Sequence, residues 1–145
     1  MSAHRGYRVC PVAGLLALLV LAGCSGAPQP TYPVEGVVTL DGRALDGGSV
    51  IFEPAEASPD GKRHSARGGI GPDGRYRLST FGTDDGAVAG RHRVVVFPKP
   101  GELVDDPKAA ARPLIPPRYS SMQASGLEYE VKPEGNRINI ELHSK

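Results

Sequence analysis

The side chains that most often carry chemistry are few and scattered in this chain of 145 residues. A zinc or iron site needs three or four converging ligands, and a catalytic nucleophile needs a base beside it. The sequence contains no His-x-His or His-x-x-x-His pair and no Gly-x-Ser-x-Gly elbow. Its histidines and cysteines are His4, His64, His92, His143, Cys10 and Cys24. We therefore expect no metal, no cofactor and no catalytic residue, although carboxylate pairs that folding brings together stay open.

Cys24 stands out because of the residues that precede it. Arg5 and Arg8 lead into an uncharged, apolar run over 12–22. As a helix this run is about 16 Å long, too short for the roughly 30 Å of a bilayer core but typical of an export signal. Residues 21–24, Leu-Ala-Gly-Cys, resemble the bacterial lipobox, in which the Cys is lipidated and becomes the mature N-terminus. The alternative is an ordinary signal peptide followed by an incidental Cys.

The lipobox resemblance implies a domain plan and a location. We expect a signal peptide over 1–23, a lipidated Cys and tether over 24–33, and one folded domain over 34–145. Several acyl chains on Cys24 would anchor the protein stably, because one chain alone binds membranes only marginally. Ser25 after the Cys resembles lipoproteins of the outer membrane. The expected location is therefore the bacterial cell envelope, at the outer membrane, with the inner membrane left open.

The composition limits the partners and the kind of core. The chain has a net charge of +1, which becomes about −1 once the signal with its two arginines is removed. No basic field for nucleic acid exists. Cys10 lies in the signal, so we expect no disulfide in the domain. With no Trp and few other aromatic residues, the core must consist mainly of Val, Ile and Leu, between turns rich in Gly and Pro.

Short segments with alternating apolar residues predict seven strands and no convincing helix. The strands are expected at 34–40, 49–53, 64–70, 75–80, 91–97, 127–131 and 137–142. The last two form an expected hairpin, with Glu128 and Glu130 facing Arg137. The segment Gly82-Thr83-Asp84-Asp85-Gly86 is interpreted as a solvated turn, because it lacks a calcium ligand pattern. The fold class that follows is all-β, a seven-stranded antiparallel β-sandwich.

Three quoted segments carry a family resemblance. VEGVVTLDGRALDGGSVIFEP, GPDGRYRLST and DGAVAGRHRVVV together resemble the carboxypeptidase regulatory-like domain, a transthyretin-like (prealbumin-like) sandwich. PPRYSSMQASGLEYEV resembles a segment of small bacterial lipoproteins that carry this domain. His92 departs from the family pattern, since it occupies a position where an aromatic side chain would pack. We interpret it as a half-buried or edge histidine, with a ligand role as the alternative.

The function expected from these features is binding rather than catalysis. The leading hypothesis is a non-catalytic, lipid-anchored envelope sandwich that acts as a structural or protein-binding module, contacted through sheet edges and the irregular section 98–117. The alternative is a carbohydrate-binding module at the cell surface, which requires exposed aromatic rings. Candidate ligand contacts are Tyr32, Phe81, His92 and Tyr119. An enzyme ranks third.

Overall fold

The computed structural model describes residues 29–99 and 115–145. These residues form strands and one short 3-10 helix, η2 (Pro117–Ser120), and contain no α-helix. The expected signal peptide, Cys24, most of the tether over 24–33 and most of the section over 98–117 lie outside the described residues. Within those residues, no helix is long and apolar enough to cross a membrane.

The first sheet is organised around its central strand β2 (Val34–Leu40). On one flank β2 pairs in parallel with two short strands, and on the other flank it pairs antiparallel with two more. The flanking strands are β10 (Asn136–Arg137), β11 (Ile140–Leu142), β6 (Arg75–Arg77) and β3 (Arg43–Ala44). The alternation of VEGVVTL predicted this strand with its observed bounds, and every second residue of it is buried.

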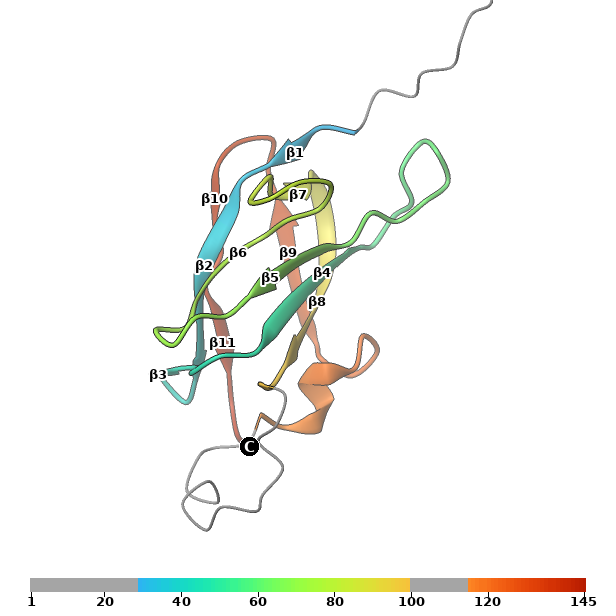
Figure 1. Cartoon of the computed structure of the whole chain (residues 1–145). Helices are drawn as coiled ribbons and strands as arrows, with labels where there is room; N and C mark the ends of the chain where they lie inside the picture. Colours follow the sequence, from blue (N-terminus) through green and yellow to red (C-terminus); the bar gives the residue numbers. More distant parts are fainter. Residues whose placement is uncertain (1–28, 100–114) are drawn as a thin grey trace, which may run out of the picture.

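The second sheet contains four antiparallel strands. Their order is β5 (Ala66–Gly69), β4 (Ser49–Pro54), β8 (Gly90–Phe97) and β9 (Leu127–Val131). At one end of the molecule β1 (Thr31–Tyr32) and β7 (Ala87–Val88) form a separate two-stranded pair. Figure 1 shows β2, β10 and β11 on one side of the molecule, with β4 and β8 on the other. An isolated bridge between Arg67 and Ser79 connects the sheets on the side of β5 and β6.

The core lies between the two sheets and is mainly aliphatic, as the composition predicted. Val38 and Leu40 of the first sheet and Val50, Val94 and Val96 of the second are no more than 1% exposed. Aromatic rings gather around Phe52, whose ring centroid lies 6.0–6.2 Å from the rings of Tyr76, His92 and Tyr129. The buried apolar surface supplies the main driving force for folding, since the described residues contain no cysteine.

The all-β fold class is confirmed, but three details of the prediction are corrected. The described residues form eleven strands rather than the seven predicted. The difference arises because β1, β3 and β7 are additional two-residue strands and the last predicted strand is divided into β10 and β11. The sheets are not wholly antiparallel. The expected hairpin is wrong: β9 pairs with β8 in the second sheet, whereas β10 and β11 pair with β2 in the first. Arg137 therefore contacts Glu35, and Glu128 contacts Arg91.

Candidate functional site

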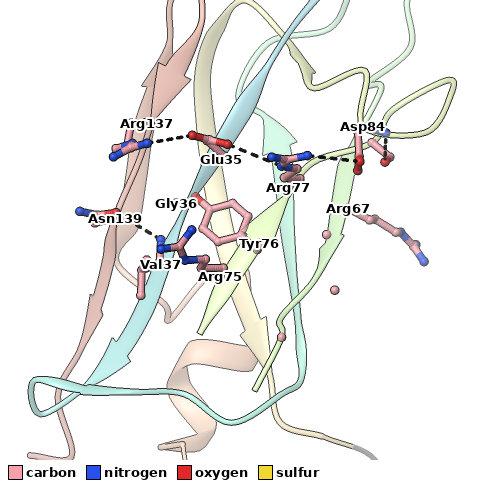
Figure 2. Close-up of a pocket in the computed structure, with 14 residues that line it drawn as sticks. Glu35, Gly36, Val37, Arg67, Arg75, Tyr76, Arg77, Asp84, Arg137 and Asn139 are labelled. Atoms are coloured by element: carbon pink, nitrogen blue, oxygen red, sulfur yellow. Dashed lines mark hydrogen bonds and ion pairs between the residues drawn. The ribbon is translucent and has the colours of Figure 1, made fainter. Parts of the chain in front are cut away.

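The most distinctive surface of the described residues is a hollow on the outer side of the first sheet, which we call the arginine groove. It encloses about 670 Å³ and is bounded by β2, β5, β6 and the β10–β11 segment. A smaller hollow of about 350 Å³ adjoins it. Glu35, Arg77, Asp84 and Arg137 line both hollows. Figure 2 shows Arg137, Glu35 and Arg77 on neighbouring strands, with Asp84 on the loop after β6.

A row of alternating charges crosses the groove perpendicular to the strands. Arg137 on β10 lies 3.0 Å from Glu35 on β2, and Arg77 on β6 lies 3.5 Å from the other oxygen of the same carboxylate. Arg77 also reaches Asp84 at 4.0 Å. The hydrogen bond from Arg137 lowers the pKa of Glu35, and this bond together with the charges of Arg137, Arg77 and Arg75 outweighs the opposing effect of burial. The carboxylate of Glu35 is therefore ionised and forms ion pairs with two guanidinium groups, those of Arg77 and Arg137 (Figure 2).

Two further arginines line the groove. Arg75 extends from β6 and pairs with Asp73 at 3.3 Å, while Arg67 comes from β5. Among the described residues, no carboxylate lies within ion-pair distance of Arg67. The lining thus contains four arginines against the two carboxylates of Glu35 and Asp84, and it contains no lysine. The groove carries a net positive charge in a chain that is almost neutral as a whole.

Beneath the groove the strand is interrupted at Ile138 and Asn139, between β10 and β11. Gly36 faces the core, and a Cβ built on it would lie 1.8 Å from the carbonyl oxygen of Ile138. The missing side chain leaves space for this carbonyl group, whose oxygen accepts a hydrogen bond from the Tyr76 hydroxyl at 2.7 Å. Opposite, the side chain of Asn139 accepts a hydrogen bond from the backbone N–H of Val37. This arrangement bridges the break between β10 and β11 without changing their register on β2.

Glycines shape the other side of the groove. A Cβ on Gly68 would lie 2.4 Å from the carbonyl oxygen of Arg77, so the absence of a side chain allows β5 and β6 to approach closely. Gly69 and Gly71 also line the hollow and contribute only backbone. Because these positions carry no side chains, the surface is concave between the arginines.

The chemistry of this groove suits the binding of anions. An arginine guanidinium presents a planar fork of N–H donors that matches a carboxylate or phosphate in bidentate geometry. The ion pairs that now occupy the arginines are open to solvent, and such pairs contribute little net stability. A ligand can therefore exchange with them at small cost. Within the described part of the chain, no group of three or more histidine, cysteine or acidic side chains is placed to hold a metal ion.

The structure places His92 elsewhere and corrects its expected environment. His92 lies on β8, which is an inner strand between β4 and β9, and is 1% exposed. It is therefore neither an edge nor a half-buried residue. Its Nδ1 lies 3.0 Å from the carbonyl oxygen of Gly90, and its Nε2 is buried without a hydrogen-bond partner among the described residues. Burial lowers the pKa of His92, so the ring is neutral and packs beside Phe52.

The aromatic candidates do not converge on one surface. Tyr119 is 5% exposed, and its hydroxyl accepts a hydrogen bond from the backbone N–H of His143 at 3.0 Å. The guanidinium of Arg118 lies 4.7 Å from the centre of the Tyr119 ring, so this ring offers no free face for stacking. Phe81 is 49% exposed and contacts His64 at 5.0 Å between ring centroids. Tyr32 is only half-buried, on β1.

The loop beside Phe81 is a turn closed by Asp85, in agreement with the interpretation of this segment. The carboxylate of Asp85 accepts hydrogen bonds from the backbone N–H groups of Thr80, Phe81 and Gly82 at 2.7–3.0 Å. Burial raises the pKa of Asp85, but these three donors outweigh it and the net shift is downward. The site candidate Cys24 lies outside the described residues.

Sequence reasoning missed the groove, although part of its signal is visible in the sequence. Arg75 and Arg77 alternate with the core residues of β6, and Glu35 does the same on β2, so their outward direction follows from period two. What the alternation could not reveal is that β6 and β10 flank β2 on opposite sides. That neighbourhood brings Arg77 and Arg137 to the same carboxylate.

Comparisons with known proteins leave the family open. No protein-family model and no curated protein matches the chain. A solved structure of a DUF3823 family protein from Parabacteroides merdae resembles it with a TM-score of 0.43 and 16% sequence identity. The match covers 79% of this chain and 46% of the other, so the chain spans less than half the length of that protein.

Proposed function

We propose that this protein is a non-catalytic binding module of the bacterial envelope, anchored by lipid at Cys24, and that the arginine groove is its binding surface. The segments that resemble the carboxypeptidase regulatory-like domain support assignment of residues 34–145 to that group of sandwiches. Such a domain acts as a rigid platform that presents a surface to a partner protein. The proposal retains the outer membrane as the location, on the strength of Ser25.

One observation carries the binding part of the proposal. The outward face of the first sheet holds a hollow of about 670 Å³ whose lining includes four arginines on β5, β6 and β10. A sheet face that only meets solvent needs neither this concavity nor this concentration of one kind of cation. Strands that are packed against the core fix the backbone positions of these arginines, so the concave surface between them exists before a partner arrives.

A second candidate function follows from Phe81. Its ring is the one large apolar side chain that the described residues expose, and it lies edge-on to His64, whose Nε2 contacts Asp60 at 2.9 Å. An exposed ring beside polar groups is suited to stacking on a sugar. This site would support the carbohydrate-binding alternative with Phe81 in place of the buried Tyr119.

Crosslinking in intact envelopes tests the proposal. A photoreactive residue in place of Val37, which lines the groove, should crosslink a defined partner, and Arg75→Gln with Arg77→Gln should abolish that crosslink. Arg91→Gln is the matched control, because Arg91 is an exposed arginine on the second sheet, paired with Glu128. A crosslink that survives the double substitution would place binding elsewhere.

Two further experiments separate the remaining parts of the proposal. Cys24→Ser should release the protein from the membrane fraction. A glycan array probed with the parent and with Phe81→Ala tests the carbohydrate alternative, which requires specific binding that the substitution removes.

A further inference from the structure

We infer that the ligand of the arginine groove is an extended, acidic segment of a partner protein whose alternate carboxylates engage Arg75 and Arg77. This inference rests on the proposed function and adds the chemistry of the ligand.

The spacing of the two arginines on β6 matches an extended peptide. Arg75 and Arg77 are two residues apart on one strand, and Tyr76 between them faces the core. Residues two apart on a strand point to the same face about 6.6–6.8 Å from each other. A peptide that runs along β6 in an extended conformation has the same repeat. Acidic residues at every second position would therefore meet both guanidinium groups in one register.

Glu35 occupies the place that a ligand carboxylate would take. Its carboxylate lies 3.0 Å from Arg137 and 3.5 Å from Arg77, so it neutralises part of the groove in the free protein. The backbone of Glu35 is fixed in β2, but its side chain is partly exposed to solvent and can rotate away from the two arginines. Glu35 thus acts as an internal competitor that weakens binding of an acidic ligand and limits binding of unsuitable anions.

The aromatic content of the groove disfavours a sugar. Tyr76 is the one aromatic residue in the lining, and it is 3% exposed with its hydroxyl committed to Ile138. It cannot offer a ring face for stacking. What the groove does present is guanidinium forks, which recognise carboxylates in bidentate geometry. Their positive charge complements an acidic peptide and would also speed its association.

Fluorescence anisotropy with a defined probe tests the inference. The probe is a labelled peptide of alternating glutamate and threonine. It is titrated with the full protein purified from its own host in a neutral detergent. We expect saturable binding that weakens as salt is added. Arg75→Gln with Arg77→Gln should weaken it at least about tenfold, as expected for two charge-assisted contacts. Glu35→Gln should tighten it about two- to fivefold, because two arginines lose their internal partner.

Matched controls separate specific recognition from general charge. Arg91→Gln removes one exposed arginine from the second sheet and should leave affinity unchanged. A peptide with glutamate at every third position places successive carboxylates on opposite faces when extended and should bind more weakly than the alternating peptide. Thermal melting of each variant checks that the fold is retained.

Several outcomes would overturn the inference. Equal affinity for the two spacings, no effect of the double arginine substitution, or weaker binding in Glu35→Gln would each contradict it. Tighter binding of polygalacturonate than of the peptide would replace the acidic peptide with an acidic sugar, and comparable binding of inorganic phosphate would reduce the groove to a general anion site. If the alternating peptide fails while the groove-dependent crosslink in envelopes persists, the proposed function stands and only the ligand chemistry is wrong.

Discussion

Gly36→Ala is the sharpest test of the structure beneath the groove. A methyl group at this position would lie 1.8 Å from the carbonyl oxygen of Ile138 and 3.1 Å from Cε1 of Tyr76. Ordinary van der Waals contact begins well above 3 Å, so the backbone at Ile138 has to move by more than about 1 Å. The backbone of a packed strand cannot do this without loss of its hydrogen bonds.

The expected magnitude follows from the bonds at that point. The shift breaks the hydrogen bond from the Tyr76 hydroxyl to Ile138 at 2.7 Å and the backbone bond from Ile138 to Glu35 at 2.9 Å. Each contributes about 1 kcal/mol net, and overpacking adds roughly 1–3 kcal/mol. We expect a loss of about 3–5 kcal/mol in the free energy of unfolding. For a domain of about 100 residues this lowers Tm by on the order of 15–25 °C.

Urea unfolding of the chain from Ser25 onward, followed by far-UV circular dichroism and tyrosine fluorescence, measures this loss. Gly69→Ala is the matched control, because nothing lies within 4 Å of a Cβ at that position. It should change stability by no more than about 0.5 kcal/mol. Tyr76→Phe should cost less in the Gly36→Ala background than in the parent, since the shared bond is already broken. Equal stability of Gly36→Ala and Gly69→Ala would refute the placement of Ile138 above Gly36.

Three further perturbations test the core and the turn. Burial lowers the pKa of His92 below its unfolded value near 6.5. At pH values between the folded and the unfolded pKa, the unfolded chain therefore binds more protons than the folded chain. The free energy of unfolding should therefore fall as pH drops below about 6.5, by at most about 1.4 kcal/mol per pH unit. Urea unfolding at a series of pH values should show that this free energy depends less on pH in His92→Phe than in the parent. Asp85→Ala removes the acceptor of three backbone N–H groups and should cost about 1–2 kcal/mol at pH 7, since the carboxylate is partly exposed. Because the pKa of Asp85 is lowered, the difference from the parent should vanish as pH falls through that pKa; a constant difference would contradict the assignment. Val95→Asp and Ile140→Asp each bury an unpaired charge at a position no more than 2% exposed, and calorimetry should find no cooperative transition in either.

The local elements of this protein follow from its sequence, because each depends on neighbouring residues. The alternation of VEGVVTL and LEYEV predicted β2 and β9 with the bounds that the structure has. Asp41-Gly42 predicted a tight turn, and both residues adopt positive φ, 49° and 80°. The aliphatic character of the core follows from composition. Period two also decides that Glu35, Arg75 and Arg77 face away from the core.

Tertiary structure alone decided which strands are neighbours, and with it the groove. Alternation states which face of a strand is buried but not which other strand it meets, so closeness in sequence predicted a hairpin of 127–131 with 137–142 that the structure does not contain. Parallel pairing of β10 with β2 brings Arg137 to Glu35 across 102 positions of the chain. The same limit explains His92 and Tyr119. His92 lies inside because the two sheets pack on each other, and Tyr119 lies inside because η2 packs against β8 and the C-terminal residues.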